Sequence, residues 1–345
     1  MSSDCVTAFA PGRVKLIGEH TDYNQGLALP FAIADGVTVR GCGLADRRIE
    51  AAAVDLDERD SFPLSSVERA DGWRGFVRGA AGELAQSGGP VAGASLEIAG
   101  TVPRGAGLSS SAALEVALVL ALLAVAGAEE PDRLELARLC SRIENDWVGA
   151  QTGLLDQIAS LFGSADHALL VDFRSLDVRP VALSLGEFKL IVLDSGEEHT
   201  HAGSGYNERR AECAEAASRL GVDSLRDASL EMASELPSPL CLRVRHVVSE
   251  NVRVGDAVAA LEGGDLARLG PLLDASHASL RDDYEVSTDA VEDAVARCKQ
   301  AGALGARIMG GGFGGSVLAL LPADASAPSG SVEVRPGPGA RVSAS

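Results

Sequence analysis

The stretch from Thr101 to Ala113 limits most strongly what this chain can fold into. It reads TVPRGAGLSSSAA: a β-rich run passes through Gly105 and Gly107 into three serines, and an apolar helix is predicted from about 111 to 125. Glycines let the backbone approach a ligand closely, and a helix N-terminus offers free N–H groups and a positive dipole end. The segment therefore predicts a strand, a glycine turn and a helix that together cradle a phosphate.

The three serines indicate how such a phosphate would be held. Their hydroxyls can donate to phosphate oxygens or ligate Mg²⁺. No GK[ST] sequence follows the glycines, which excludes a Walker A loop. Taken alone, the run is also compatible with a serine-rich helix cap.

A second glycine-rich segment lies near the C-terminus, at 306–320, with the sequence ARIMGGGFGGSVLAL. Five glycines occupy six positions between two β-rich runs, whereas a tight hairpin requires only two residues with positive φ. The excess of glycine predicts a backbone pressed against a ligand or another loop. A close-packed turn is the alternative interpretation.

Near the N-terminus, the segment 10–26 is expected to be a short loop between apolar runs. It concentrates polar groups of the kind that a polyol ligand needs, because carboxylates accept hydrogen bonds from hydroxyls while imidazole and amide groups both donate and accept. A solvated turn is the alternative. The HExxH spacing of a zinc helix is absent. The polar residues considered for such a ligand are Arg13, Lys15, Glu19, His20, Asp22, Tyr23 and Asn24.

A single carboxylate, Asp156, stands inside the apolar stretch GLLDQ at 153–157. It is a candidate catalytic group or, alternatively, a helix-capping residue.

Charge and cysteine usage exclude several classes of function. With 30 basic and 49 acidic residues, the net charge is −19, which argues against a nucleic-acid binder and against docking on an anionic membrane. The six cysteines are scattered without a CxxC pair, so we expect neither a zinc site nor disulfides. No secretory signal is seen, and the longest apolar run, at 116–126, is too short to span a bilayer. A cytoplasmic protein is expected.

The pattern of apolar residues predicts alternating strands and helices in the first half and mostly helices in the second. Strands are expected at 27–34, 36–39, 49–54, 95–98, 169–172, 188–193 and on both sides of the turn within 306–321. Helices are expected at 73–86, 111–125, 132–147, 208–219, 240–261, 266–280 and 288–301. The last stretch, 323–345, is rich in Pro, Gly and Ser and is expected to be partly loose.

Read together, these segments resemble the galactokinases of the GHMP kinase family. GRVKLIGEHTDYNQG is similar to the sugar signature, PRGAGLSSSAALEVA to the ATP-binding motif, GARIMGGGFGGSVLAL to the third motif, and GLLDQIASLFG to the segment that holds the catalytic aspartate. The motifs occur in the family's order and span about residues 9–342. The family pattern usually has Asn where this chain has Lys15.

The resemblance implies an α/β (α+β) chain of two domains with the active site in the cleft between them. The N-terminal α/β domain would span residues 1–175 and the C-terminal, ferredoxin-like α+β domain residues 176–345. The implied activity is ATP-dependent phosphorylation of the C1 hydroxyl of galactose. A related kinase of another sugar or a cyclitol, and a non-catalytic sugar and ATP sensor, are the alternatives. We expect no nucleic-acid or membrane partner, and a monomer or weak dimer.

The resemblance also implies residue roles. Asp156 would be the catalytic base, and Arg13 would keep it charged and stabilise the phosphoryl group in transfer. The sugar would be bound by Glu19, His20, Asp22, Gly153 and Tyr206. Trp73 would lie near the adenine, and Ser110 or Ser111 with Glu144 would hold Mg²⁺. The ATP phosphates would be wrapped by Gly105, Ala106, Gly107, Leu108, Ser109, Ser110 and Ser111.

Overall fold

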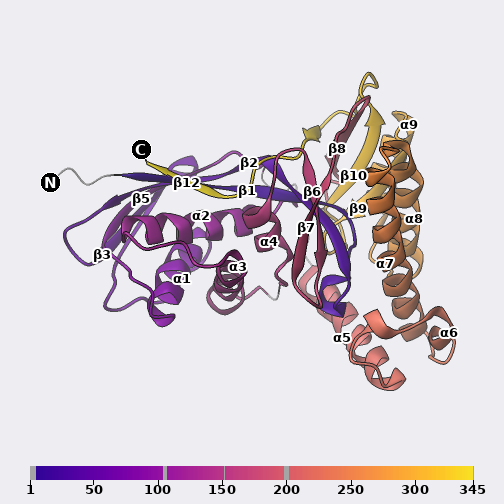
Figure 1. Cartoon of the computed structure of the whole chain (residues 1–345), viewed down its shortest axis with the longest axis horizontal. Coiled ribbons are helices and arrows are strands. Elements are labelled where there is room, and N and C mark those ends of the chain that lie inside the picture. The colour runs from indigo at the N-terminus through magenta and orange to yellow at the C-terminus, as the bar shows by residue number, and fades with distance from the viewer. Residues whose placement is uncertain (1–4, 104–106, 151, 198–201, 345) are drawn as a thin grey trace.

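A computed structural model describes residues 5–103, 107–150, 152–197 and 202–344. Figure 1 shows two sheets, one at the left with helices below it and one at the right with helices beside it. The chain follows this order from indigo to yellow, except that its last strand returns to the first sheet.

The first sheet is built around two long N-terminal strands, β1 (Val6–Ile17) and β2 (Leu27–Gly43). Its strand order is β12-β1-β2-β5-β3-β4, and β2 also pairs with β6, which pairs with β7. The strand β3 runs parallel to β5, while the other pairs are antiparallel. The further strands are β3 (Arg48–Ala53), β4 (Glu58–Pro63), β5 (Ala94–Gly100), β6 (His167–Asp172), β7 (Asp177–Ala182) and β12 (Arg341–Ala344).

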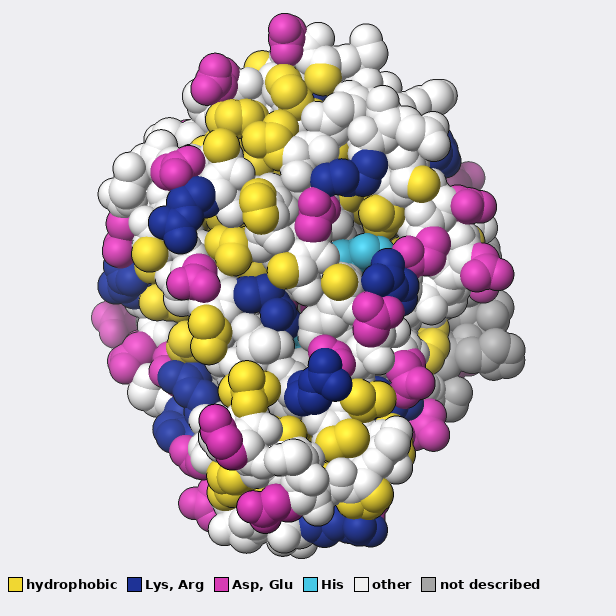
Figure 2. All heavy atoms as spheres, turned by 90° about the vertical axis from the view of Figure 1, so that its right-hand side faces the viewer, with side chains coloured by type: hydrophobic (Ala, Val, Ile, Leu, Met, Phe, Trp, Pro, Cys, Tyr) yellow, Lys and Arg dark blue, Asp and Glu magenta, His cyan; other side chains and the backbone are white. Residues whose placement is uncertain are grey.

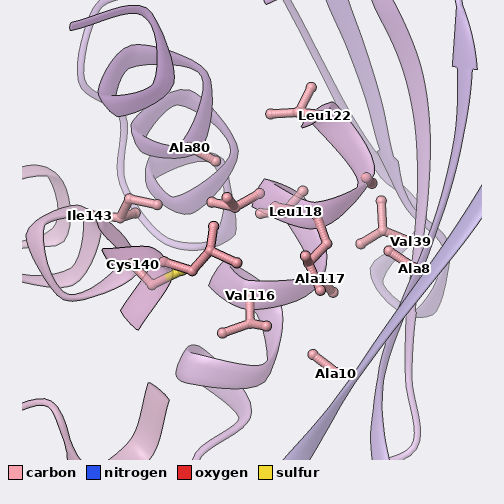
Figure 3. Packing of buried hydrophobic residues seen from close by; sticks show 14 of the residues in the cluster. Ala8, Ala10, Val39, Ala80, Val116, Ala117, Leu118, Leu122, Cys140 and Ile143 are labelled. Carbon is pink, nitrogen blue, oxygen red and sulfur yellow. The ribbon is translucent and has the colours of Figure 1, made fainter. Parts of the chain in front are cut away.

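The helix α2 (Ser110–Val125) forms the centre of the first core. Its side chains are buried on nearly all sides, which the continuous apolar sequence from Val116 to Leu123 requires. Figure 3 shows Leu118 and Val116 between the sheet residue Val39 on one side and the neighbouring helices on the other. Those helices are α1 (Trp73–Gln86), α3 (Arg133–Arg142), a π-helical turn (Ile143–Val148) and α4 (Leu155–Phe162).

The second sheet has the order β11-β8-β10-β9 and is antiparallel throughout. Long helices pack on it and bury a second apolar core. Its strands are β8 (Phe188–Asp194), β9 (Gly305–Met309), β10 (Ser316–Pro322) and β11 (Ser331–Val334). The helices of this half are α5 (Ala202–Leu220), α6 (Leu230–Ala233), α7 (Leu240–Glu262), α8 (Leu269–Asp282) and α9 (Asp289–Gln300).

Most predicted helices are confirmed, and two predictions about loops are wrong. Residues 10–17 were expected in a loop but belong to β1, because their backbone pairs with β2 while alternate polar side chains point toward the site. The stretch 323–345 was expected to be partly loose, but 331–334 and 341–344 within it form β11 and β12. These tail residues are ordered because they pair with distant strands, and no local sequence pattern in the tail predicts that pairing. The domain boundary at 175 stays a prediction; it falls in the β6–β7 hairpin, and β7 still pairs with the first sheet.

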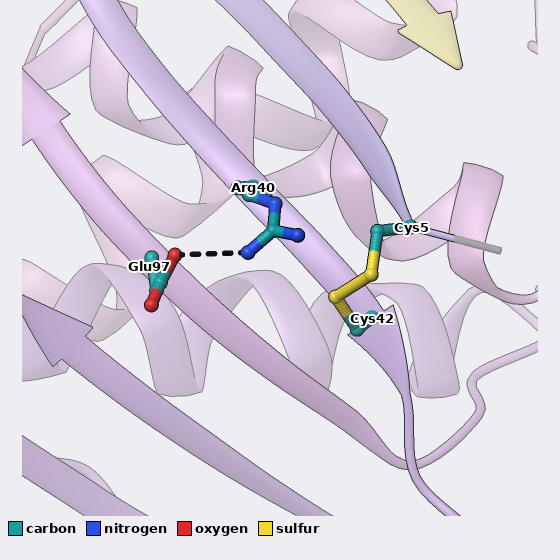
Figure 4. The surroundings of a disulfide bond; sticks show 4 residues. All are labelled: Cys5, Arg40, Cys42 and Glu97. Atoms are coloured by element: carbon teal, nitrogen blue, oxygen red, sulfur yellow. Dashed lines mark hydrogen bonds and ion pairs between the residues drawn. A yellow bond between two sulfur atoms is a disulfide. The ribbon is translucent and has the colours of Figure 1, made fainter. Parts of the chain in front are cut away.

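A disulfide joins Cys5 to Cys42, so the expectation of no disulfide is wrong for this pair. Val6 and Gly41, their chain neighbours, face each other across β1 and β2, and the two Cα atoms are 4.4 Å apart. Figure 4 shows the bond beside the ion pair between Arg40 of β2 and Glu97 of β5. The spacing of 37 residues gave no signal, because only the strand register brings the two cysteines together.

The surface over the second half mixes charges of both signs. Figure 2 shows dark blue and magenta side chains interspersed across this face, with apolar groups among them, several of which lie side by side near the top of the view. No continuous stripe of basic side chains is seen on this face. Within the residues that the structure describes, no helix has the length and apolar character needed to cross a membrane.

We predict that the chain, purified in air and unfolded in urea without reductant, takes up iodoacetamide at the four cysteines outside the disulfide and at all six after reduction. Reduction should also lower the free energy of unfolding by about 2–4 kcal/mol, because it removes a cross-link from the unfolded chain. Mass spectrometry and urea titration measure the two effects. Labelling of six cysteines without reductant would contradict the assignment.

Candidate active site

A cleft of about 510 Å³ lies between the two halves of the molecule and collects most of the sequence-predicted residues. Its walls come from β1 and the turn after it, the segment before α4, the start of α5, and the glycine turn after β9. The lining residues are Arg13, Lys15, Glu19, His20, Asp22, Gly149, Ala150, Thr152, Gly153, Leu155, Asp156, Tyr206, Asn207, Gly310 and Gly311.

Arg13 and Asp156 form a bidentate ion pair at one end of this cleft. Arg13 Nε lies 2.7 Å from Asp156 Oδ1, and Arg13 Nη2 lies 2.9 Å from Oδ2. Ser109 Oγ also donates to Oδ2. Burial alone would lower the pKa of Arg13, but Asp156 raises it above its ordinary value, so the guanidinium is charged. The pair therefore fixes a carboxylate whose two oxygens are oriented toward donors from β1 and from the serine segment.

The glycine–serine segment reaches this pair through the backbone. Arg13 Nη1 donates to the carbonyl of Gly107 at 2.8 Å, and Arg13 N donates to the carbonyl of Leu108 at 3.0 Å. Gly107 has φ +66°, a conformation that favours glycine, and Ser109 has φ +57° just before α2 begins at Ser110. The N-terminus of α2 is thus directed to the same end of the cleft as Asp156. Gly105 and Ala106 lie outside the described residues.

Glu144 lies next to the serine segment, in a network of hydrogen bonds. Ser111 Oγ donates to Oε1 at 2.9 Å, while Thr152 Oγ1 donates to Oε2 at 2.6 Å. Gln157 Nε2 donates both to Glu144 Oε2 and to Glu115 Oε2, each at 3.1 Å. Burial, together with the negative charge of Glu144, raises the pKa of Glu115 to about 10, so Glu115 is neutral at pH 7.

Glu19 also lines the cleft, where it lies between two cations. Lys15 Nζ is 2.6 Å from Oε2 and Arg307 Nη2 is 2.6 Å from Oε1, which also accepts from Gly310 N at 2.8 Å. Burial by itself would raise the pKa of Glu19, but Lys15 and Arg307 lower it to about 2. The carboxylate is therefore charged at neutral pH, and it ties β1 to β9 and to the glycine turn.

His20 lines the cleft and has one ring nitrogen without a hydrogen-bond partner among the described residues. Its Nδ1 lies 2.8 Å from Tyr23 Oη, which lies 2.9 Å from Tyr284 Oη. Its Nε2 is buried and has no hydrogen-bond partner among the described residues. Burial lowers the pKa of His20 to about 3, so the imidazole is neutral and available to a hydroxyl.

Asp22, Gly153 and Tyr206 complete the wall. A Cβ on Gly153 would lie 2.7 Å from Asp22 Oδ2, so only glycine leaves that carboxylate its place. A Cβ on Gly311 would lie 3.3 Å from the Tyr206 ring, so the ring lies against the glycine turn. The rings of His20 and Tyr206 are 5.5 Å apart.

The structure thus brings together the predicted sugar and catalytic residues in one cleft, with Ser109, Ser111 and Glu144 beside it. Trp73 is not among the residues that line the cleft. Its indole N–H donates to Glu58. Arg307 was missed by sequence reasoning, although its position directly before the glycine turn was a usable signal. Lys15 was singled out, and its partner Glu19 follows four residues later.

Three family models match the chain. Their descriptions are "Galactokinase galactose-binding signature" over residues 2–41, "GHMP kinases N terminal domain" over 75–164 and "GHMP kinases C terminal" over 257–330. The fold and the cleft therefore define a kinase of the GHMP class, with both domain types and a sugar-binding signature in one chain.

Comparisons with individual proteins identify the family more narrowly than the domain models do. The galactokinase of Mycobacterium tuberculosis (strain ATCC 25618 / H37Rv) is 46% identical over 322 residues, which covers 91% of this chain and 88% of the relative. The galactokinase of Roseiflexus sp. (strain RS-1) is 45% identical and covers 90% and 82%. The crystal structure of Lactococcus lactis galactokinase complexed with galactose superposes with a TM-score of 0.89 at 34% identity and covers 98% of this chain and 95% of that one. The chain belongs to the galactokinase family.

We predict that neutral His20 makes stability depend on pH. The pKa of His20 is about 3 in the folded protein but near its ordinary value of 6.5 in the unfolded chain. The unfolded chain therefore binds more protons as the pH falls below about 6.5, and the folded state loses stability. Between about pH 7.5 and pH 5, wild type should lose about 2 kcal/mol more than the His20→Gln variant. Urea unfolding at the two pH values measures this, and equal losses would contradict it.

Proposed function

We propose that this protein transfers the γ-phosphoryl group of ATP to the C1 hydroxyl of galactose and produces galactose 1-phosphate and ADP. The observation that carries the proposal is the Arg13–Asp156 pair, which lies where the polar cleft meets the N-terminus of α2. Membership of the galactokinase family and the likeness to a galactokinase bound to galactose support it.

Asp156 has the position of a base for the acceptor hydroxyl. Its carboxylate borders the cleft, and its oxygens are oriented by Arg13 and Ser109. In the reaction it takes the proton from the hydroxyl as the oxygen attacks the phosphorus in line with the leaving ADP. Arg13 holds the carboxylate in place through its bidentate contact and stabilises negative charge on the transferring group, since phosphoryl transfer depends mainly on positioning and charge stabilisation.

The sugar hydroxyls find acceptors and donors on the cleft wall. Asp22 offers a carboxylate to hydroxyl donors, and His20 offers its Nε2. Glu19 borders the cleft but already accepts from three groups, so its main effect is to hold β1 and the glycine turn in place. Gly153 leaves room for the sugar beside Asp22, and Tyr206 presents an apolar ring edge to it.

ATP use follows from membership of this kinase family, and we assign its phosphates to the glycine–serine segment. Free N–H groups at the start of α2, with Gly107, Leu108 and Ser109, suit an anion there. We extend this to Gly105 and Ala106 on the sequence alone. Trp73 stays a prediction for the adenine.

Glu144 and the hydroxyl of Ser111 or Ser110 are the protein groups that would hold Mg²⁺. Hydroxyl and carboxylate oxygens are ligands of the kind that this ion prefers, and it usually takes only one or two from the protein and the rest from phosphates and water. In the described part of the chain no cluster of three metal-binding side chains occurs, which agrees with this division. A bound Mg²⁺ would neutralise phosphate charge.

We also propose a cytoplasmic location, where both sugar and ATP are available. The Cys5–Cys42 disulfide would then be held as two thiols in the reducing cell and form on exposure to air.

We predict that Asp156→Asn lowers kcat with galactose by about 100-fold or more, because the amide preserves the shape but removes the base. Wild-type and variant melting temperatures should agree within a few degrees. Asp282→Asn is the matched control, since it breaks another Asp–Arg pair, with Arg281, at an exposed site. Retention of a third of wild-type kcat by Asp156→Asn would refute the assignment.

Glu144→Gln should raise the Mg²⁺ concentration for half-maximal rate by about 10-fold or more, because a carboxylate ligand is replaced by a neutral amide. The amide oxygen can still accept from Thr152 Oγ1, and the amide NH₂ can donate to the Ser111 hydroxyl, so the local structure should persist. A Mg²⁺ titration of the rate at saturating ATP and galactose measures the change. An unchanged Mg²⁺ requirement would place the metal ligand elsewhere.

A further inference from the structure

Lys15 shares a face of β1 with Arg13. Side chains two residues apart in a strand point the same way, and both residues line the cleft. Arg13 is occupied by Asp156, whereas Lys15 lies toward the part of the cleft bordered by Glu19 and His20. The ammonium is thus placed among the groups assigned to the sugar rather than beside those assigned to ATP.

The hydrogen-bonding capacity of Lys15 is only partly used. An ammonium has three N–H donors and no acceptor. In the described part of the chain, Glu19 is the group with which Nζ interacts, at 2.6 Å. The side chain is only 9% exposed, so its other donors have little access to bulk water. Because Lys15 lines the cleft, these donors can bind water there or a hydroxyl of a bound ligand.

The need for a cation beside Glu19 does not by itself explain why a lysine stands at position 15. Arg307 is fully buried and already lies 2.6 Å from the same carboxylate. One carboxylate thus has two cationic partners, and the cluster of three carries a net charge of +1. Glu19 would therefore keep a cationic partner without Lys15.

We propose that Lys15 is a specificity-determining residue of the acceptor site: anchored on Glu19, its ammonium donates a hydrogen bond to one hydroxyl oxygen of the sugar. This inference rests on the proposed function. Because a lysine ammonium can only donate, it requires a hydrogen-bond acceptor at that position of the sugar. An Asn side chain could both donate and accept there. The assignment concerns binding of the acceptor, not the chemistry at Asp156.

The test combines enzyme variants with substrate analogues. Lys15→Met keeps the length and apolar stem of the side chain and removes the ammonium. With galactose, its KM should rise by about 10-fold or more while kcat stays within about threefold, as expected for the loss of one hydrogen bond to a charged group. Lys299→Met, which removes an exposed lysine paired with Asp274, is the matched control and should leave both constants unchanged.

The 2-, 3-, 4- and 6-deoxygalactoses then identify the contacted hydroxyl. For wild type, one of these sugars should lose about 10-fold or more in kcat/KM through the missing contact with Lys15. With that sugar, wild type and Lys15→Met should agree within about threefold, while the other analogues keep the difference seen with galactose. Such selective coupling would not arise if Lys15 acted only on the fold.

Two outcomes would overturn the inference. One is an unchanged KM for galactose in Lys15→Met; the other is an equal loss with galactose and with every deoxy sugar, which would make Lys15 a counter-ion of Glu19. If Lys15→Met does not fold, Lys15→Asn gives the same test with the residue usual in the family. Failure of the proposed function is distinguishable, since wild type would then not phosphorylate galactose at all.

Discussion

The buried pair between Glu19 and Arg307 is the interaction on which the cleft depends. Glu19 follows β1 of the first sheet, and Arg307 lies in β9 of the second, 288 residues away in the chain. Arg307 Nη1 also donates to the backbone carbonyls of Lys15 and Leu16. Removing one partner of such a pair would leave an uncompensated buried charge, which typically costs about 3–5 kcal/mol. The two halves are therefore held in register where the substrate must bind.

The strand β1 positions two of the charged side chains that line the cleft. Its residues Arg13 to Lys15 pair with β2, and Arg13 N also donates to the carbonyl of Leu108, so the backbone fixes the side-chain directions. Arg13 then meets Asp156, and Lys15 meets Glu19. A rigid strand thus sets the spacing between the groups assigned to phosphoryl transfer and those assigned to the sugar, which a flexible loop would not do.

The charged and polar groups of the cleft are stabilised by fixed partners rather than by water. Glu19 is held charged by cations, Glu115 is neutral through burial and the nearby Glu144, and His20 is neutral because of burial. Each state is set before any ligand arrives, so little reorganisation is needed during binding or reaction. The same burial makes the site a source of instability at low pH, which is the cost of preorganised polar groups.

The sequence by itself determined most of the local helices and strands, and it predicted most residues of the candidate site. The apolar run of α2, the glycine–serine segment and the order of the motifs indicated the fold, the phosphate cradle and Asp156, because these depend on neighbouring residues. The tertiary structure alone decided that 10–17 is a strand, that the tail returns as β12, that Cys5 meets Cys42, and that Arg307 faces Glu19. These contacts join residues far apart in the chain, and no local periodicity encodes which distant strand or side chain will be the partner.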